Sequence, residues 1–188
     1  MNDEEFEKTV YELCDKDEFV QLEAQNKIAS LGSDAVSQLN EIITTITDSH
    51  VKLEVAKLLS DFNDVSSIDT FIKLLYDPNK WVRRESSSAL TKYGEEVIDP
   101  LLIVLDDENW RARGAAAWVL GNLGDERSLD ALLVAIEDSE SFVRSGAVFG
   151  LGKIGGPKSI IALKKAAEYD ESSYVRANAI KFLEDLEN

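Results

Sequence analysis

Apolar residues recur along this chain with the spacing of one face of a helix. Counted from a valine or alanine that we call the anchor, they fall at plus 4, plus 8 and plus 11. Because this spacing is close to the roughly 3.6 residues of a helical turn, each stretch is predicted to form an amphipathic helix. The clearest sets are Val55, Leu59 and Phe62; Ala116, Leu120 and Leu123; Ala147, Leu151 and Ile154; and Ala179, Leu183 and Leu186.

The anchors themselves repeat along the whole chain. They stand at positions 20, 51, 82, 112, 143 and 175, which are 31, 31, 30, 31 and 32 residues apart. A fixed period of this length is typical of stacked repeats, in which each repeat is one supersecondary unit. We therefore expect six repeats of about 31 residues that form a single domain over residues 1–188.

Each repeat is predicted to hold a second helix. Glycines at plus 12, namely Gly32, Gly94, Gly124 and Gly155, are placed to end the anchored helices, since glycine adopts a positive φ at low cost. Polar starts and further apolar helices follow, at residues 35–46, 66–76, 95–105, 129–136 and 157–168, with another around residues 6–13. No strand-like alternation competes, so we predict an all-α chain of twelve helices, two per repeat.

An aspartate precedes an arginine by six residues in four successive repeats. The aspartate is expected to end one helix and the arginine to lie in the first turn of the next, where its planar fork reaches a carboxylate of the same or the adjacent repeat. Repetition at every step favours a structural ladder over a catalytic site. The ladder residues are Asp77, Arg83, Asp107, Arg113, Asp138, Arg144, Asp170 and Arg176.

These motifs resemble the HEAT family, in particular the short HEAT-like repeats first associated with phycobilin lyases. The resemblance covers essentially the whole chain and rests on the ladder together with Gly121-Asn122-Leu123-Gly124 and Gly152-Lys153-Ile154-Gly155. It implies a right-handed α-α superhelix whose anchored helices line the concave surface. Repeats one and two depart from it, since Asp15 faces Gln21, and Ile46 stands where the later repeats have aspartate, opposite Lys52.

Two sets of residues are expected on the inner helices, away from the apolar stripe. Trp118 and Phe149 occupy equivalent plus 6 positions among small residues, near Asn122 and Lys153, and rings in a groove provide rigid contact area for a partner. The alternative is that the rings cover glycine gaps between repeats. Three glutamates at plus 3 are predicted to form an acidic row, unless they merely pair with Lys27 and Lys57 on a solvated face. They are Glu23, Glu54 and Glu85.

The composition narrows the function classes. A net charge of −16 disfavours nucleic acid and anionic lipid as partners. No apolar run reaches the roughly 18 residues of a membrane span and the first residues lack the order of a secretory signal, so a cytoplasmic protein is expected. The only histidine, His50, is interpreted as a packing residue and the only cysteine, Cys14, as a buried structural thiol. No catalytic set, metal site or cofactor is assigned.

The preferred interpretation is a non-enzymatic scaffold that binds a protein or peptide partner, basic and amphipathic in character, on the concave face. The alternative, which the resemblance implies, is a bilin lyase-like subunit that acts on a phycobiliprotein or a related chromophore as half of a two-subunit enzyme. One shaped groove and one acid would serve that chemistry, and the sequence singles out no carboxylate for it.

Overall fold

The computed structural model describes residues 1–187, and the chain forms two compact units. Unit 1 spans Met1–Ala89 and unit 2 begins at Leu90, so the boundary lies within α6. Within the described residues there are twelve α-helices, three short 3-10 segments and no strand. The all-α prediction is therefore confirmed, while the assignment of residues 1–188 to one domain stays a prediction. No helix among the described residues has the length and apolar character needed to cross a membrane.

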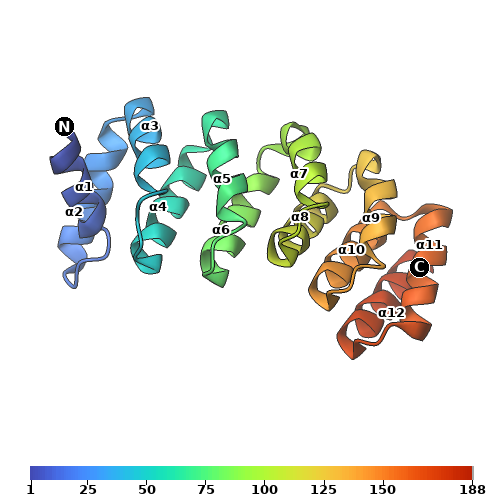
Figure 1. Cartoon of the computed structure of the whole chain (residues 1–188). Helices are drawn as coiled ribbons and strands as arrows, with labels where there is room; N and C mark the ends of the chain where they lie inside the picture. Colours follow the sequence, from blue (N-terminus) through green and yellow to red (C-terminus); the bar gives the residue numbers. More distant parts are fainter. Residues whose placement is uncertain (188) are drawn as a thin grey trace. The chain divides into compact units, whose positions relative to one another are not determined.

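Along each unit, odd-numbered helices alternate with even-numbered helices that carry the anchor (Figure 1). We call the even-numbered helices inner and the odd-numbered helices outer. Unit 1 contains α1 (Asp3–Glu12), α2 (Glu18–Ser30), α3 (Ser33–Ile42), α4 (Ser49–Phe62), η1 (Val65–Ser67), α5 (Ile68–Leu74) and α6 (Lys80–Thr91). Unit 2 contains η2 (Gly94–Val97), α7 (Ile98–Val104), α8 (Trp110–Leu123), η3 (Glu126–Ser128), α9 (Leu129–Ala135), α10 (Ser141–Ile154), α11 (Gly156–Tyr169) and α12 (Ser173–Glu187).

The core lies between the inner and outer helices, as the apolar pattern predicts. The plus 4 and plus 8 residues of repeats two, four and five are fully buried, for example Leu59 and Leu120. The plus 11 residues lie nearer the ends of the helices and are less buried, and Leu186, which was expected in the core, is 36% exposed. The Leu186 side chain lies against the end of α10, because a Cβ on Gly155 would come within 3.3 Å of it.

The glycine prediction holds for two of the inner helices, since Gly124 and Gly155 cap α8 and α10. Helix α2 is capped by Leu31 and Gly32 is the N-cap of α3, whereas α6 ends at Thr91 and Gly94 begins η2. Gly32, Gly94, Gly124 and Gly155 all have a positive φ, between 57° and 69°. Asn63 does the same work after α4, with φ 51° and ψ 40°, and donates its backbone N–H to Leu59 O. The sequence pattern missed this residue, although asparagine is the side chain that most readily replaces glycine in the left-handed region.

Candidate functional site

Small residues bring the inner helices of unit 2 into close contact. Helix α10 packs along both α8 and α12, as Figure 1 shows. A Cβ on Gly121 would lie only 2.8 Å from the Gly150 Cα, and one on Gly146 would lie 2.8 Å from the Ala117 Cβ. These distances are shorter than atoms tolerate, so glycine is required for the two backbones to approach this closely. The α8 and α10 backbones thus form a floor of closely packed helices with only small side chains between them.

Three aromatic rings from successive inner helices stand over this floor. The Trp118 and Phe149 rings are stacked, with centroids 6.3 Å apart and planes at 11°. The Phe182 ring meets Phe149 edge-on, with centroids 5.6 Å apart. Trp118 is 39% exposed, whereas Phe149 and Phe182 are half-buried. We call these three residues the ring row. Phe182 escaped the sequence analysis because it stands one position later in its repeat, where plus 6 is Lys181.

The two predicted rings therefore have different environments. A Cβ on Gly121 would lie 2.8 Å from the Phe149 ring, so this phenylalanine fills the space that the glycine leaves, as the alternative interpretation proposed. Phe182 covers Gly152 in the same way. Trp118, in contrast, stacks on Phe149 and is still 39% exposed. The open apolar surface of the ring row is thus concentrated at one residue.

Asn122 and Lys153, predicted as part of the same site, lie beside the rings. The Asn122 side chain donates a hydrogen bond to the Trp118 carbonyl oxygen at 2.9 Å, one turn back on α8. The Lys153 Nζ lies 5.8 Å from the centroid of the Phe149 ring. Both side chains are exposed, so polar groups border the open ring.

The predicted acidic row lies in the other unit. Glu23 is exposed and pairs with Lys27 at 3.1 Å, and Glu54 is half-buried and pairs with Lys57 at 2.7 Å. Glu85 is half-buried. The alternative, pairing within each helix, therefore describes the first two glutamates as they stand in the structure.

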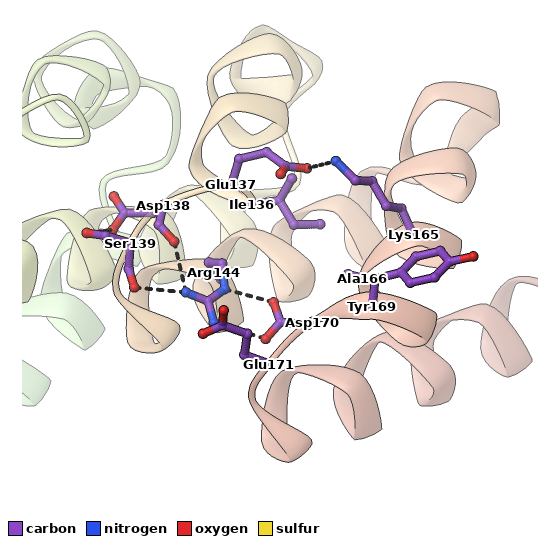
Figure 2. Close-up of a pocket in the computed structure, with 10 residues that line it drawn as sticks. All are labelled: Ile136, Glu137, Asp138, Ser139, Arg144, Lys165, Ala166, Tyr169, Asp170 and Glu171. Carbon is purple, nitrogen blue, oxygen red and sulfur yellow. Dashed lines mark hydrogen bonds and ion pairs between the residues drawn. The ribbon is translucent and has the colours of Figure 1, made fainter.

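The ladder residues join one repeat to the next in a recurring geometry. Figure 2 shows the Arg144 guanidinium between two repeats. Its Nη1 donates to the carbonyl oxygens of Asp138 and Ser139 in its own repeat, at 2.9 and 3.0 Å. Its Nε and Nη2 donate to the two carboxylate oxygens of Asp170 in the next repeat, at 2.7 and 3.0 Å. Of the two partners left open by the sequence, the carboxylate thus comes from the adjacent repeat.

Neighbouring ladder positions repeat or simplify this arrangement. Arg113 binds the carboxylate of Asp138 through Nε and Nη2, at 2.8 and 3.0 Å. In unit 1 a lysine takes the place of the arginine, and Lys52 Nζ lies 3.1 Å from Asp77 Oδ2. Gln21 donates to the carbonyl oxygen of Asp15, as the later arginines do at the same step. The departures in repeats one and two therefore reduce the ladder to single contacts without removing it.

The ladder sets the charge state of its carboxylates. Burial by itself would raise the pKa of Asp138, but hydrogen bonds from Arg113 and from the Glu140 backbone N–H lower that pKa overall. The pKa of Asp170 is lowered in the same way against the effect of burial, by Arg144 and the Ser172 backbone N–H. Both carboxylates are thereby held in the charged form.

Two surface pockets of unit 2 border the ladder. One, of about 420 Å³, lies beside Arg144 and Asp170, and the ion pair of Lys165 with Glu137, at 2.8 Å, also lines it (Figure 2). The other, of about 590 Å³, lies one repeat earlier beside Arg113 and Asp138. Because the arginine that lines each pocket is already fully engaged with protein groups, neither pocket presents a free cation to a ligand.

Two single-residue interpretations were wrong. His50 is exposed in the first turn of α4, where its backbone N–H donates to Asp48 Oδ1, so it is not a packing residue. Cys14 is half-buried rather than buried. Its partial burial, together with the charges of Glu54 and Asp48, raises the pKa of the thiol to about 11.

Comparison with known families agrees with this architecture. The family model for HEAT repeats matches residues 6–91, 41–108 and 98–184, which together cover nearly the whole chain. The chain belongs to the HEAT repeat family. No curated protein sequence matches it.

Three solved structures with a similar fold are distant from this chain in sequence. An archaeal HEAT-like repeats protein from Thermococcus onnurineus has a TM-score of 0.57 at 12% identity, over 99% of this chain and 88% of that one. A designed armadillo repeat protein in complex with the peptide (KR)4 has a TM-score of 0.52 at 19% identity, over 95% and 98%. The CpcE–CpcF complex of phycocyanin lyase from Nostoc sp. has a TM-score of 0.44 at 20% identity, over 94% and 96%, too low to indicate a shared activity.

Proposed function

We propose that this HEAT repeat chain is a non-enzymatic scaffold that binds a segment of another protein on the inner-helix face of unit 2, with Trp118 as the anchor. The observation that carries the proposal is the ring row: an open indole stacked on a phenylalanine that is itself held edge-on by a second. Such a ring loses little entropy on binding because its neighbours already fix its position.

The remaining predicted residues complete the site. Phe149 stacks on one side of the indole, while Asn122 and Lys153 provide polar groups beside the rings. Large rings in the centre with hydrogen-bonding groups around them are typical of the residues that dominate binding energy in protein interfaces. Among structures of similar fold, the designed armadillo repeat protein is one that holds a peptide.

The charge of the chain favours a basic, amphipathic partner segment. With 36 acidic and 20 basic side chains, the protein attracts cationic segments and repels phosphate backbones. The apolar side of such a segment would meet Trp118, and its basic side would face the acidic surface. Its association rate should then fall as salt screens the charges.

Selection of peptides followed by alanine substitution tests the proposal. A displayed random peptide library is selected on the full chain, and the dissociation constant of an enriched peptide is measured by fluorescence anisotropy. We expect Trp118→Ala combined with Phe149→Ala to weaken binding by about 2 kcal/mol or more.

The matched control is Tyr174→Ala, which removes another exposed ring of the same unit, 67% exposed, outside the ring row. It should leave the dissociation constant unchanged. Equal binding by the wild type and the double variant would contradict the proposal, provided that circular dichroism shows the variant to be folded.

A further inference from the structure

A second set of rings stands in unit 1, at the start of each inner helix. Phe19 is 83% exposed, Trp81 is 50% exposed, and His50 is exposed between them in sequence. One residue two positions earlier caps each helix and accepts the backbone N–H of the ring residue: Asp17 at 2.9 Å, Asp48 at 2.8 Å and Asn79 at 2.8 Å. Because the caps are equivalent, the three rings leave their helices from the same position in the first turn.

A glutamate follows each of these rings by four residues. The pairs are Phe19 with Glu23, His50 with Glu54, and Trp81 with Glu85. Residues four apart lie on the same side of a helix, one turn above the other. Each inner helix of unit 1 therefore presents an aromatic face and a carboxylate side by side. We call this set of six residues the aromatic–acid row.

The helices that carry the row are tied together. Helix α1 packs against both α2 and α4. The ion pair of Lys52 with Asp77 joins the first turn of α4 to the segment that precedes α6. The three pairs of ring and glutamate, which we call steps, therefore follow one another from repeat to repeat within unit 1.

Cations of the chain itself already occupy these steps. Lys27 pairs with Glu23, and Lys57 pairs with Glu54. At the third step, the Lys80 Nζ lies 4.9 Å and the Arg84 Cζ 5.8 Å from the Trp81 ring centroid. Both lysines that pair with glutamates are about half exposed, and exposed pairs of this kind are held weakly. The steps thus attract cations, and the chain's own lysine side chains are held weakly enough to be replaced by basic side chains of a ligand.

We propose that the aromatic–acid row binds lysine and arginine side chains of a basic protein segment, one cation per repeat. This proposal rests on the proposed function, since it requires that the chain binds protein segments, and it names the chemistry that unit 1 recognises. A cation over a ring face is attracted by the ring quadrupole, and the adjacent carboxylate neutralises its charge. Charge complementarity selects the occupant, because residues 1–89 carry 18 acidic and 9 basic side chains.

Unit 2 lacks this combination. The positions equivalent to the three glutamates are Ala115, Gly146 and Asn178, which carry no charge. The two units therefore offer different chemistry from the same helical register: cation steps in unit 1 and the open indole in unit 2.

Binding of a fluorescent peptide of alternating lysine and arginine to the full chain tests the proposal. The test variant combines Glu23→Gln, Glu54→Gln and Glu85→Gln. The control combines Glu4→Gln, Glu7→Gln and Glu41→Gln, which remove the same charge from exposed positions on the outer helices α1 and α3. We expect the test variant to weaken binding about tenfold or more and the control about threefold or less, since charges remote from the ligand are screened by salt.

Substitution of the rings separates the row from the general negative field. Phe19→Leu combined with Trp81→Leu keeps the net charge and an apolar side chain at both positions but removes two π faces. This variant should bind the lysine–arginine peptide about threefold more weakly, or weaker still. No binding by the wild type, equal losses in the two glutamine variants, or no loss in the leucine variant would each overturn the proposal.

The same peptide also distinguishes failure of this proposal from failure of the proposed function. Trp118→Ala with Phe149→Ala should leave binding of the lysine–arginine peptide unchanged, while it weakens binding of the peptide enriched from the library. If only the triple glutamine variant fails to weaken peptide binding, the aromatic–acid row is refuted. If only Trp118→Ala with Phe149→Ala fails to weaken binding of the library peptide, the ring row is refuted as a binding site.

Discussion

The two units use the same helical register for opposite purposes. Three residues after the anchor, unit 1 has Glu23, Glu54 and Glu85, while unit 2 has Ala115, Gly146 and Asn178. In unit 2 the small side chains let the α8, α10 and α12 backbones meet, and Gly146 lies directly against Ala117. In unit 1 the same position projects a carboxylate. The same position of the repeat can thus be used for helix packing or for surface charge.

The buried stripe, in contrast, should be equally important in both units. Leu59 and Leu120 occupy the same plus 8 position and are both fully buried. Leu59→Ala and Leu120→Ala should each lower the free energy of unfolding by about 2 to 5 kcal/mol, because each leaves a cavity. Urea denaturation measures the cost, and amide hydrogen exchange shows which unit it affects. A loss below about 1 kcal/mol at either site would contradict the shared core.

The inner-helix contact should tolerate bulk in unit 1 and not in unit 2. Gly121→Val places a branched side chain against the Gly150 backbone and should cost about 3 kcal/mol, at the upper end for overpacked sites. Ala29, at the equivalent position of repeat one, is exposed. Ala29→Val should therefore change stability by less than about 0.5 kcal/mol. Similar thermal midpoints for the two variants would show that the glycine contact does not matter.

The ladder should be stronger in unit 2 because the arginine makes more bonds than the lysine. Arg144→Ala removes four hydrogen bonds and leaves Asp170 without its guanidinium, so we expect a loss of about 1 to 3 kcal/mol. Lys52→Ala removes one contact with Asp77 and should cost less. Denaturation of both variants checks the order. An unchanged melting temperature for Arg144→Ala, combined with loss of peptide binding, would show instead that Arg144 belongs to a binding site.

The ladder also predicts a pH dependence. Asp138 and Asp170 have lowered pKa values in the folded chain, so their contribution is fully present above the pKa of the unfolded carboxyl, 3.8. It is lost as the pH falls below about 4, where the unfolded state binds protons more readily. Asp170→Asn should reduce the slope of stability against pH in this range. A slope equal to that of the wild type would contradict the pairing.

Local patterns predicted the fold well. The plus 4 and plus 8 positions of repeats two, four and five form the core, although Leu183 of repeat six is only half-buried. The plus 12 glycines take a positive φ, and both features depend on the geometry of a single helix. Contacts between repeats were less predictable. That Phe149 fills the space over Gly121 depends on how closely two helices approach, and no single-helix pattern contains that distance.

The site was predicted only in part for the same reason. Trp118, Asn122 and Lys153 were found because they share a helical face, but Phe182 is one position out of register. The exposure of His50 was missed because a residue at an aromatic position was assumed to pack, and its neighbours Phe19 and Trp81 are themselves exposed. A repeated position indicates an equivalent place in the fold, and whether that place is open depends on the adjacent repeat.

The indole N–H signals of the three tryptophans, Trp81, Trp110 and Trp118, provide the most direct test of the central claim, that the units bind at different rows. In a heteronuclear NMR titration of the full chain, the peptide enriched from the library should shift the Trp118 signal. The lysine–arginine peptide should shift Trp81, and Trp110, whose ring packs against Phe142 and Arg111, should stay in place with both. A selected peptide that leaves the Trp118 signal unchanged at saturation would contradict the account.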